Sequence, residues 1–127
     1  MQYVGHTMGI PGCHPYEAIE RFAAIGFTGI ELVCRDGTQF DSSHDRAQAS
    51  RTADYAESYG LPVAALTPYA ADVNSADPIV ARAALKEMRD TIDLAHIMRA
   101  RFVRAYGGRD LTDDREGGFE RAVDALR

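Results

Sequence analysis

The sequence predicts an α/β fold in which four parallel strands alternate with helices. Short apolar stretches rich in β-branched residues alternate with longer stretches whose apolar residues recur at the helical period. Gly and Pro residues separate the two kinds of stretch. No linker or low-complexity segment divides the 127 residues, which is the usual size of one domain. Alternation of this kind implies parallel strands joined by right-handed helical crossovers.

The first strand and helix are predicted from a turn and two helix-end signals. The strand is expected over residues 3–8 and ends in a glycine-rich turn. Pro15 stands where the first helical residue should be, since that position leaves its N–H unpaired in any case. Apolar residues with helical spacing continue to Ile25, and Gly26 predicts a left-handed cap. The second strand is expected over residues 29–34.

The next helix is predicted to begin at a serine cap, after the turn signal of Asp36 and the glycine that follows it. Ser42 or Ser43 can cap this helix, which carries small residues on one face and ends near Gly60. The third strand is expected over residues 61–67. Its second residue is a proline, which a strand tolerates near its start because a lost donor matters least there.

The longest helix is predicted from Asp77 and Pro78, a cap followed by a first-turn proline. Its apolar stripe runs from Val80 to Met98. The fourth strand is expected over residues 102–106. After an acidic loop, the final stretch again shows apolar residues at helical spacing.

Two architectures fit this order of elements. One is a doubly wound open sheet, a flavodoxin-like binding module without catalysis. The other is the first half of a (β/α)8 barrel, which needs about 250 residues in full. Strand polarity favours the half barrel, because central strands of an open parallel sheet are buried on both faces. Glu31 lies within the second predicted strand and Arg104 within the fourth, and a polar lumen can accommodate both.

The expected domain is therefore a single partial barrel over residues 1–127, truncated within or after its fourth helix. A barrel half requires parallel strands in the order 1-2-3-4, whereas a doubly wound sheet requires 2-1-3-4. Spatial strand order thus separates the two architectures.

Charge and composition exclude several classes of function. The chain has 14 Lys+Arg against 19 Asp+Glu, a net charge of −5, and lacks the basic surface of a nucleic-acid or anionic-membrane binder. No apolar run approaches the roughly 18 residues that span a bilayer, and the N-terminus has no signal-peptide pattern. Two isolated cysteines, Cys13 and Cys34, then predict a cytoplasmic protein without a disulfide. Neither glycine-rich nucleotide fingerprint occurs.

Several motifs resemble those of the xylose isomerase-like TIM barrels, the sugar-phosphate isomerase/epimerase superfamily. Gly-Phe-Thr-Gly-Ile-Glu-Leu at 26–32 resembles that family's strand-two element, G-(F/Y)-x-G-(I/V)-E-(L/I). The other matching segments, in chain order, are 60–63, 74–78 with Arg82, 92–95 and 103–108. The stretch 96–101 departs from the family, because many relatives have a glycine there.

The resemblance implies metal-dependent proton transfer beside the carbonyl of a small sugar, a sugar phosphate or a polyol-derived ketone. In the family's epimerases two Glu exchange the proton, and a Mn²⁺- or Mg²⁺-type ion holds the adjacent oxygens. The family's metal ligands come mainly from strands five to eight. The resemblance therefore implies no catalytic or metal-binding residue within residues 1–127, and no activity of this chain alone. An open half barrel is also expected to self-associate.

Active sites of (β/α)8 barrels lie at the carboxyl ends of the strands. The candidate substrate-binding or supporting residues near those ends are His6, Glu31, Tyr69 and Tyr106. His6 can hydrogen-bond a substrate hydroxyl or a carboxylate. Glu31 matches the family's strand-two Glu and can orient His6. The two tyrosines can form a wall that keeps water from a sugar.

Other polar residues are interpreted structurally. Cys34 and Thr67 also lie near strand ends, without an assigned role. The three remaining histidines, His14, His44 and His96, are interpreted as capping or helix-surface residues, and no pair of histidines has zinc-ligand spacing. The acidic loop from Asp110 to Glu116 is interpreted as solvated surface.

Overall fold

A computed structural model describes residues 3–35, 40, 45–109 and 113–127. Its single sheet has the parallel strands β1 (Val4–His6), β2 (Gly29–Val33), β3 (Val63–Thr67) and β4 (Phe102–Val103). Their spatial order is β1-β2-β3-β4. This order confirms the predicted half of a (β/α)8 barrel, and the doubly wound alternative is wrong.

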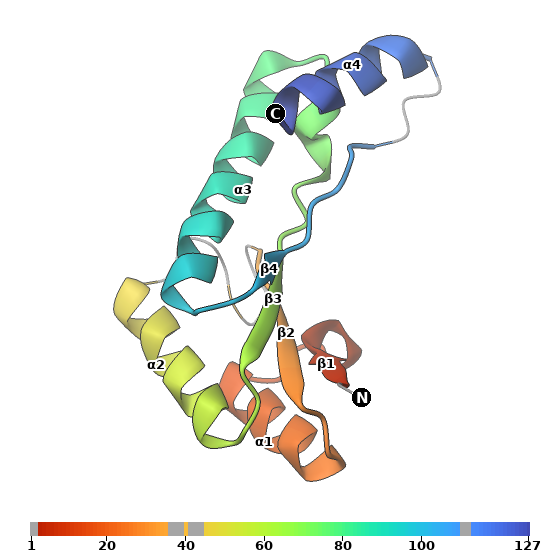
Figure 1. Cartoon of the computed structure of the whole chain (residues 1–127). Coiled ribbons are helices and arrows are strands. Elements are labelled where there is room, and N and C mark those ends of the chain that lie inside the picture. The colour runs from red at the N-terminus through yellow and green to blue at the C-terminus, as the bar shows by residue number, and fades with distance from the viewer. Residues whose placement is uncertain (1–2, 36–39, 41–44, 110–112) are drawn as a thin grey trace.

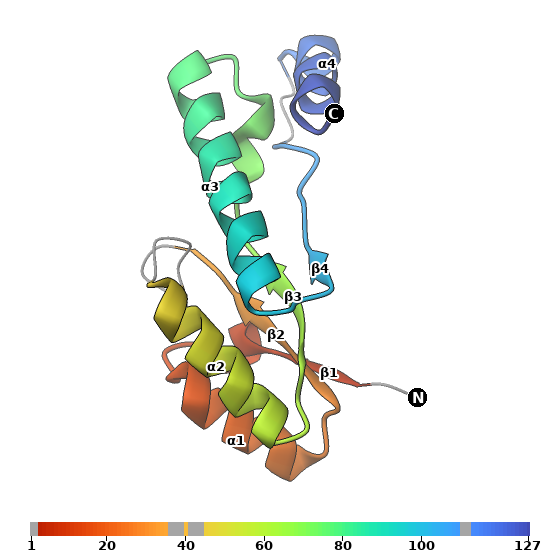
Figure 2. The ribbon, with the colours of Figure 1, turned by 60° about the vertical axis from the view of Figure 1, so that its left-hand side comes forward.

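The helices are α1 (Pro15–Ile25), α2 (Arg46–Ser58), α3 (Pro78–Ile97) and α4 (Arg115–Ala125), with short 3-10 segments η1 (Thr7–Gly9) and η2 (Ala71–Asn74). The first three of them form one layer against the sheet. Helices α1, α2 and α3 lie on one side of the sheet (Figure 2), and α4 lies beside η2 and the start of α3, away from the strands (Figure 1). Among the described residues, no helix covers the opposite side of the sheet.

Local signals fix most helix ends where the sequence predicts them. The His14 ring accepts a hydrogen bond from the backbone two residues on, so His14 is the N-cap of α1. Asp77 caps α3 in the same way, and Gly26 closes α1 with a φ of 97°.

The prediction for the start of α2 is wrong. Asp45, not Ser42 or Ser43, is the cap, because its carboxylate directly precedes the first helical residue and accepts from the N–H of Ala47 at 3.0 Å. The two serines, with Asp36, His44 and Asp110, lie outside the described residues.

All four strands are shorter than predicted, β2 by a single residue. The chain leaves β1 after His6 and turns into η1. The Thr7 hydroxyl there accepts a hydrogen bond from the N–H of Val33, which joins the ends of β1 and β2. Pro62 precedes β3, and its carbonyl accepts from Ile30. β4 ends at Val103, well short of the predicted residue 106.

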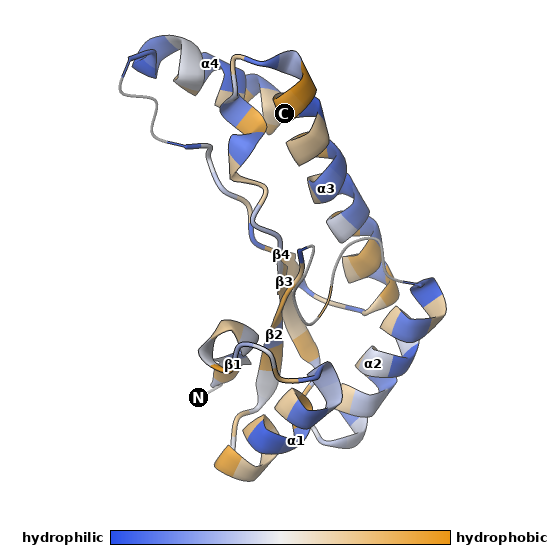
Figure 3. Ribbon diagram, turned by 180° about the vertical axis from the view of Figure 1, so that it is seen from behind, coloured by the Kyte–Doolittle hydropathy of each residue, from blue (hydrophilic) through white to orange (hydrophobic). Residues whose placement is uncertain are grey.

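The helix-covered face of the sheet carries the main apolar core. Ile30, Leu32 and Leu66 are fully buried there among residues of α1, α2 and α3. Gly5 permits close packing of α1, since a Cβ at this position would lie 2.6 Å from the Phe22 ring. Hydrophilic and hydrophobic segments alternate along each helix (Figure 3), as expected of helices that bury only one face.

Parts of the predicted apolar stripes are exposed. The exposed members are Ile25, Tyr59, Val80, Ile92, Phe119 and Leu126. In α4 the reason is clear: the helix packs against η2 through Gly118 and Ala122, which leaves Phe119 71% exposed. Helical spacing therefore identified the helix but not the face that it buries.

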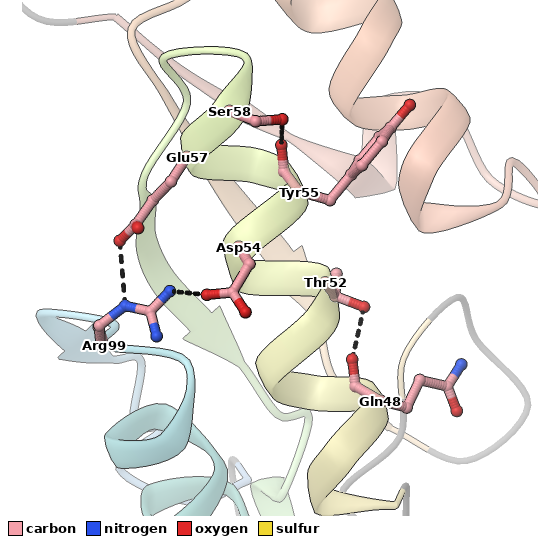
Figure 4. A network of polar contacts seen from close by, with 7 residues as sticks. All are labelled: Gln48, Thr52, Asp54, Tyr55, Glu57, Ser58 and Arg99. Atoms are coloured by element: carbon pink, nitrogen blue, oxygen red, sulfur yellow. Dashed lines mark hydrogen bonds and ion pairs between the residues drawn. The ribbon is translucent and has the colours of Figure 1, made fainter.

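Arg99 lies within the stretch 96–101, where the sequence departs from the family before β4. Its φ is 57°, a left-handed conformation in which glycine is favoured. The guanidinium binds Asp54 at 2.7 Å and Glu57 at 3.0 Å, both on α2 (Figure 4). These carboxylates raise the pKa of Arg99. The residue with the strained backbone, Arg99, is thus also the residue whose ion pairs join α2 to the end of α3.

Candidate functional site

The side of the sheet without helices has a row of residues set by strand register. His6 pairs with Glu31, Glu31 with Ala65, and Ala65 with Phe102. Ile30 pairs with Val63, but the next residue, Glu31, pairs with Ala65, so β3 contains one extra residue at this point. This irregularity brings Ala65 level with Glu31. Residues paired in register point to the same face, and the neighbouring positions Ile30 and Leu32 face the helices. The row therefore lies on the inner face, where a barrel would have its lumen.

His6, Glu31 and Thr67 form a polar group on this inner face. The His6 Nε2 lies 3.6 Å from the Glu31 Oε1, and the Thr67 hydroxyl donates to that same carboxylate oxygen. Both side chains of the His–Glu pair are mostly covered, at 28% and 24% exposed. The His6 Nε2 is itself buried and has no hydrogen-bond partner among the described residues. A buried ring nitrogen of this kind needs a partner, so the group is suited to bind a polar ligand.

Tyr69 and Tyr106 come together beyond the carboxyl ends of β3 and β4. Their ring centroids are 5.6 Å apart, and the Tyr69 hydroxyl donates to the Met8 sulfur at 3.0 Å. Arg35 lies over the Tyr69 ring at 4.8 Å, and Arg104 over the Tyr106 ring at 5.3 Å. Burial, followed by the neighbouring phenol, raises the pKa of Tyr69, while the two guanidinium groups oppose the rise.

Asn74 anchors the two loops that carry these tyrosines. Its side chain accepts from the N–H of Arg109 at 3.0 Å and donates to the carbonyl of the same residue at 2.8 Å. Gly108 is required beside it, because a Cβ there would lie 2.2 Å from Asn74 and its φ is 108°. Arg109 also binds Asp72, which lowers the pKa of that carboxyl. These contacts join η2 to the loop after β4.

The structure thus brings all four candidate residues to one side of the molecule, in two groups. His6 and Glu31 lie in the inner row, and Tyr69 and Tyr106 lie beyond the strand ends. Sequence reasoning gave no role to Thr67 or Asn74. Thr67 could have been found from its place at the carboxyl end of the predicted strand next to that of Glu31. No sequence signal links Asn74 to a loop 35 residues away.

The other singled-out residues lie elsewhere. Cys34 is buried in the core beside Phe40, and His96 is exposed on α3. Within the described ranges, no three His, Cys, Asp or Glu side chains form a cluster that could hold a metal ion. The His6–Glu31 pair alone is too small a donor set for the ions that the resemblance implies. The residues present therefore do not fit a metal centre by themselves.

Parallel strands in sequence order, an outer helix layer and a polar inner face define a half of a (β/α)8 barrel. The chain belongs to the family of xylose isomerase-like TIM barrels, whose sequence profile matches residues 19–127. Comparison with curated proteins gave no match. None of the helices in the described segments is long and apolar enough to cross a membrane.

Solved structures of sugar epimerases share this fold. A D-psicose 3-epimerase crystallised in the presence of D-fructose superposes with a TM-score of 0.79 at 15% identity, over 99% of this chain and 46% of that one. A D-allulose 3-epimerase from Methylomonas sp. in complex with D-allulose gives 0.73 at 23% identity, over 99% and 45%. An L-ribulose 3-epimerase gives 0.72 at 24% identity, over 99% and 44%. The chain thus spans less than half the length of the structures it matches.

Proposed function

We propose that this chain supplies the first four βα units of a sugar isomerase or epimerase that moves a proton beside a carbonyl. One observation carries the proposal: the His6 Nε2 is buried beside Glu31 on the inner face of the sheet and has no hydrogen-bond partner in the part of the chain that the structure describes. The substrate is a small sugar, a sugar phosphate or a polyol-derived ketone. The names of the structural neighbours, which are ketose 3-epimerases, support this class of chemistry.

The proposed roles follow from what each side chain can donate or accept. Glu31 accepts a hydrogen bond from Thr67, and its carboxylate lies 3.6 Å from the His6 Nε2. That same nitrogen has no hydrogen-bond partner among the described residues and hydrogen-bonds a substrate hydroxyl. Tyr69 and Tyr106 cover the substrate beyond the strand ends and limit the access of water. These residues bind and orient, whereas the proton-transferring carboxylates are expected from strands five to eight.

A Mn²⁺- or Mg²⁺-type ion belongs to this proposal only as part of the completed barrel. When bound, such an ion would act as a Lewis acid on the substrate oxygens. The described residues do not form a cage for it, so we assign no step of the reaction to a metal held by this chain. We propose that residues 1–127 form a partial barrel domain, ending within or after its fourth helix, and that this chain alone is inactive.

The test joins this chain to strands five to eight of one of the matched epimerases and measures ketose epimerisation with added Mn²⁺. Glu31→Gln is expected to lower kcat by about tenfold or more, since a positioning carboxylate is lost. Glu20→Gln is the matched control, because Glu20 is an exposed carboxylate bound to Tyr55 on the outer helices. Equal activity of the two variants would contradict the role of Glu31, and turnover by residues 1–127 alone would contradict the predicted inactivity.

We also propose that the isolated chain self-associates through the inner face. Phe102 belongs to the row on this face and is 58% exposed, and Val4, two residues before His6 in β1, alternates to the same face. Exposed apolar area of this kind favours association. Sedimentation velocity is expected to show oligomers that Phe102→Ser diminishes. A monomer at all concentrations would contradict this proposal.

A further inference from the structure

We propose that Arg104, together with Arg35, binds an oxyanion carried by the substrate, so that the site prefers a ketose bearing a phosphate or a carboxylate to a neutral ketose. This inference rests on the proposed function, because it names the substrate class of the same site. It concerns specificity, and neither arginine is assigned a part in proton transfer.

The backbone places Arg104 on the inner face. Its N–H donates to the carbonyl of Leu66 at 2.9 Å and so extends the β3–β4 ladder by one step. Phe102, two residues earlier, belongs to the row of residues on the inner face. Side chains alternate between the two faces of a strand, so the side chain of Arg104 lies on the same inner face as that of Phe102. Arg104 therefore lies next to Thr67 along the face, one step nearer the carboxyl ends than Glu31.

The contacts of Arg104 leave its hydrogen-bonding edges available. The guanidinium lies over the Tyr106 ring, is exposed, and forms no ion pair within the described ranges. Arg109, five residues later, is by contrast bound by Asp72. Attraction to the face of an aromatic ring restrains a guanidinium group, while its five N–H donors point outward in the plane of the guanidinium itself. Such a fork matches the two oxygens of a carboxylate or phosphate.

A second guanidinium lies close to the same place. Arg35 packs over Tyr69, whose ring contacts that of Tyr106, so the four side chains form a continuous group. Both guanidinium groups lie near enough to the Tyr69 hydroxyl to counter the rise in its pKa. Two guanidinium groups over adjacent tyrosine rings form a local cationic site in a chain of net charge −5.

The position of Glu31 gives the bound substrate a direction. An oxyanion near Glu31 would be repelled, whereas one at Arg104 and Arg35 would be attracted. The anionic end of a ketose would therefore sit beyond the strand ends, and its hydroxyl and carbonyl groups would reach down toward His6. A neutral sugar gains nothing from the two charges.

The experiment measures ligand binding to residues 1–127 by NMR titration at constant ionic strength. The ligands are D-fructose 6-phosphate, D-fructuronate, D-fructose and inorganic phosphate. The anionic ketoses are expected to bind at least about tenfold more tightly than D-fructose, which corresponds to about 1.4 kcal/mol. The stronger of the two anionic ketoses identifies the anion as phosphate or carboxylate, and inorganic phosphate shows how much the anion contributes alone.

Arg104→Gln is expected to remove this tenfold preference, and Arg104→Lys to keep part of it, since a point charge remains without the fork. Arg101→Gln is the matched control: Arg101 also lies over an aromatic ring, that of Phe102, but it precedes β4. Equal affinity for D-fructose and both anionic ketoses, or equal losses in the Arg104 and Arg101 variants, would overturn the inference. Binding is measured without turnover, so the anion site can be confirmed even if epimerisation is never found. Likewise, epimerisation by the joined barrel can be found even if no preference for anionic ketoses is measured.

Discussion

Two regions of the molecule are held together by different kinds of contact. From β1 to β3, the helix-covered face of the sheet has one large apolar core with fully buried Ile30, Leu32 and Leu66. Where η2, α3 and the loop after β4 meet, the apolar cluster is small: Ala70, Val73, Ala84 and Met88. Polar contacts of Asn74 and Arg109 join the elements of this second region.

The difference teaches how the site is built. Apolar burial is not directional and stabilises the sheet as a whole. Hydrogen bonds are directional and fix the two loops that carry Tyr69 and Tyr106. The two loops are therefore held in place by their own polar contacts, apart from the apolar core under the sheet, as expected of functional loops on a rigid scaffold.

The largest expected effect is a difference in the free energy of unfolding between variants on the two faces of the sheet. Leu32→Ala is expected to lower the free energy of unfolding by about 2–5 kcal/mol, because it removes a fully buried side chain. Phe102→Ala, on the bare face, is expected to change it by less than about 1 kcal/mol, as most of the ring is already exposed. Urea denaturation measures both, and comparable losses would contradict the contrast between the faces.

A smaller and more local effect is expected in the polar region. Asn74→Ala leaves the N–H and carbonyl of Arg109 without their side-chain partner, at a cost of about 1–3 kcal/mol. Hydrogen exchange should accelerate in residues 104–109 and stay unchanged in β2. Faster exchange throughout β2 and β3 would show that the polar contacts support the whole fold and are not confined to the loops.

Arg99 tests how ion pairs offset a strained backbone. Arg99→Gly removes both the left-handed strain and the two ion pairs, whereas Arg99→Ala removes only the ion pairs. The glycine variant is expected to melt at or slightly above the original temperature, and the alanine variant below it. High salt should lower the melting temperature of the Arg99 protein and spare the glycine variant. An alanine variant more stable than the glycine variant would contradict this explanation.

The smallest expected effect is on the pH dependence of stability. Arg109 lowers the pKa of Asp72 in the folded chain, so the folded carboxyl stays ionised to lower pH than the unfolded one. Its contribution is present above the ordinary Asp pKa of about 3.9 and is lost as pH falls through the lower folded value. Asp72→Asn should therefore show a shallower loss of stability below about pH 4. Identical acid profiles would contradict a stabilising role of this pair.

The alternation of residues was enough to predict the fold and the polar face of the strand that carries Glu31. A charged Glu31 between Ile30 and Leu32 indicated a strand with one polar face, and the structure places it beside His6. Local signals such as Pro15 and Gly26 fixed helix ends, since their effects depend only on neighbouring residues.

What the sequence did not indicate depends on contacts between distant segments. The Asn74–Arg109 anchor joins residues that no period or spacing relates. Phe119 has helical spacing with apolar neighbours, yet it is exposed because α4 packs on η2 and not on the sheet. Arg99 occupies a glycine-type conformation through ion pairs with α2, which a single sequence does not reveal.

The most direct test of the proposed epimerase function measures proton exchange at the carbon beside the carbonyl of a ketose. The chain joined to strands five to eight of a matched epimerase is incubated with Mn²⁺ and a ketose in deuterated water, and NMR records the carbon beside the carbonyl. The proposed function predicts that deuterium appears at that carbon, and that Glu31→Gln slows its appearance. A fusion that melts cooperatively, binds the ion and still leaves that carbon fully protonated would contradict the claim that this inner face is half of an epimerase site.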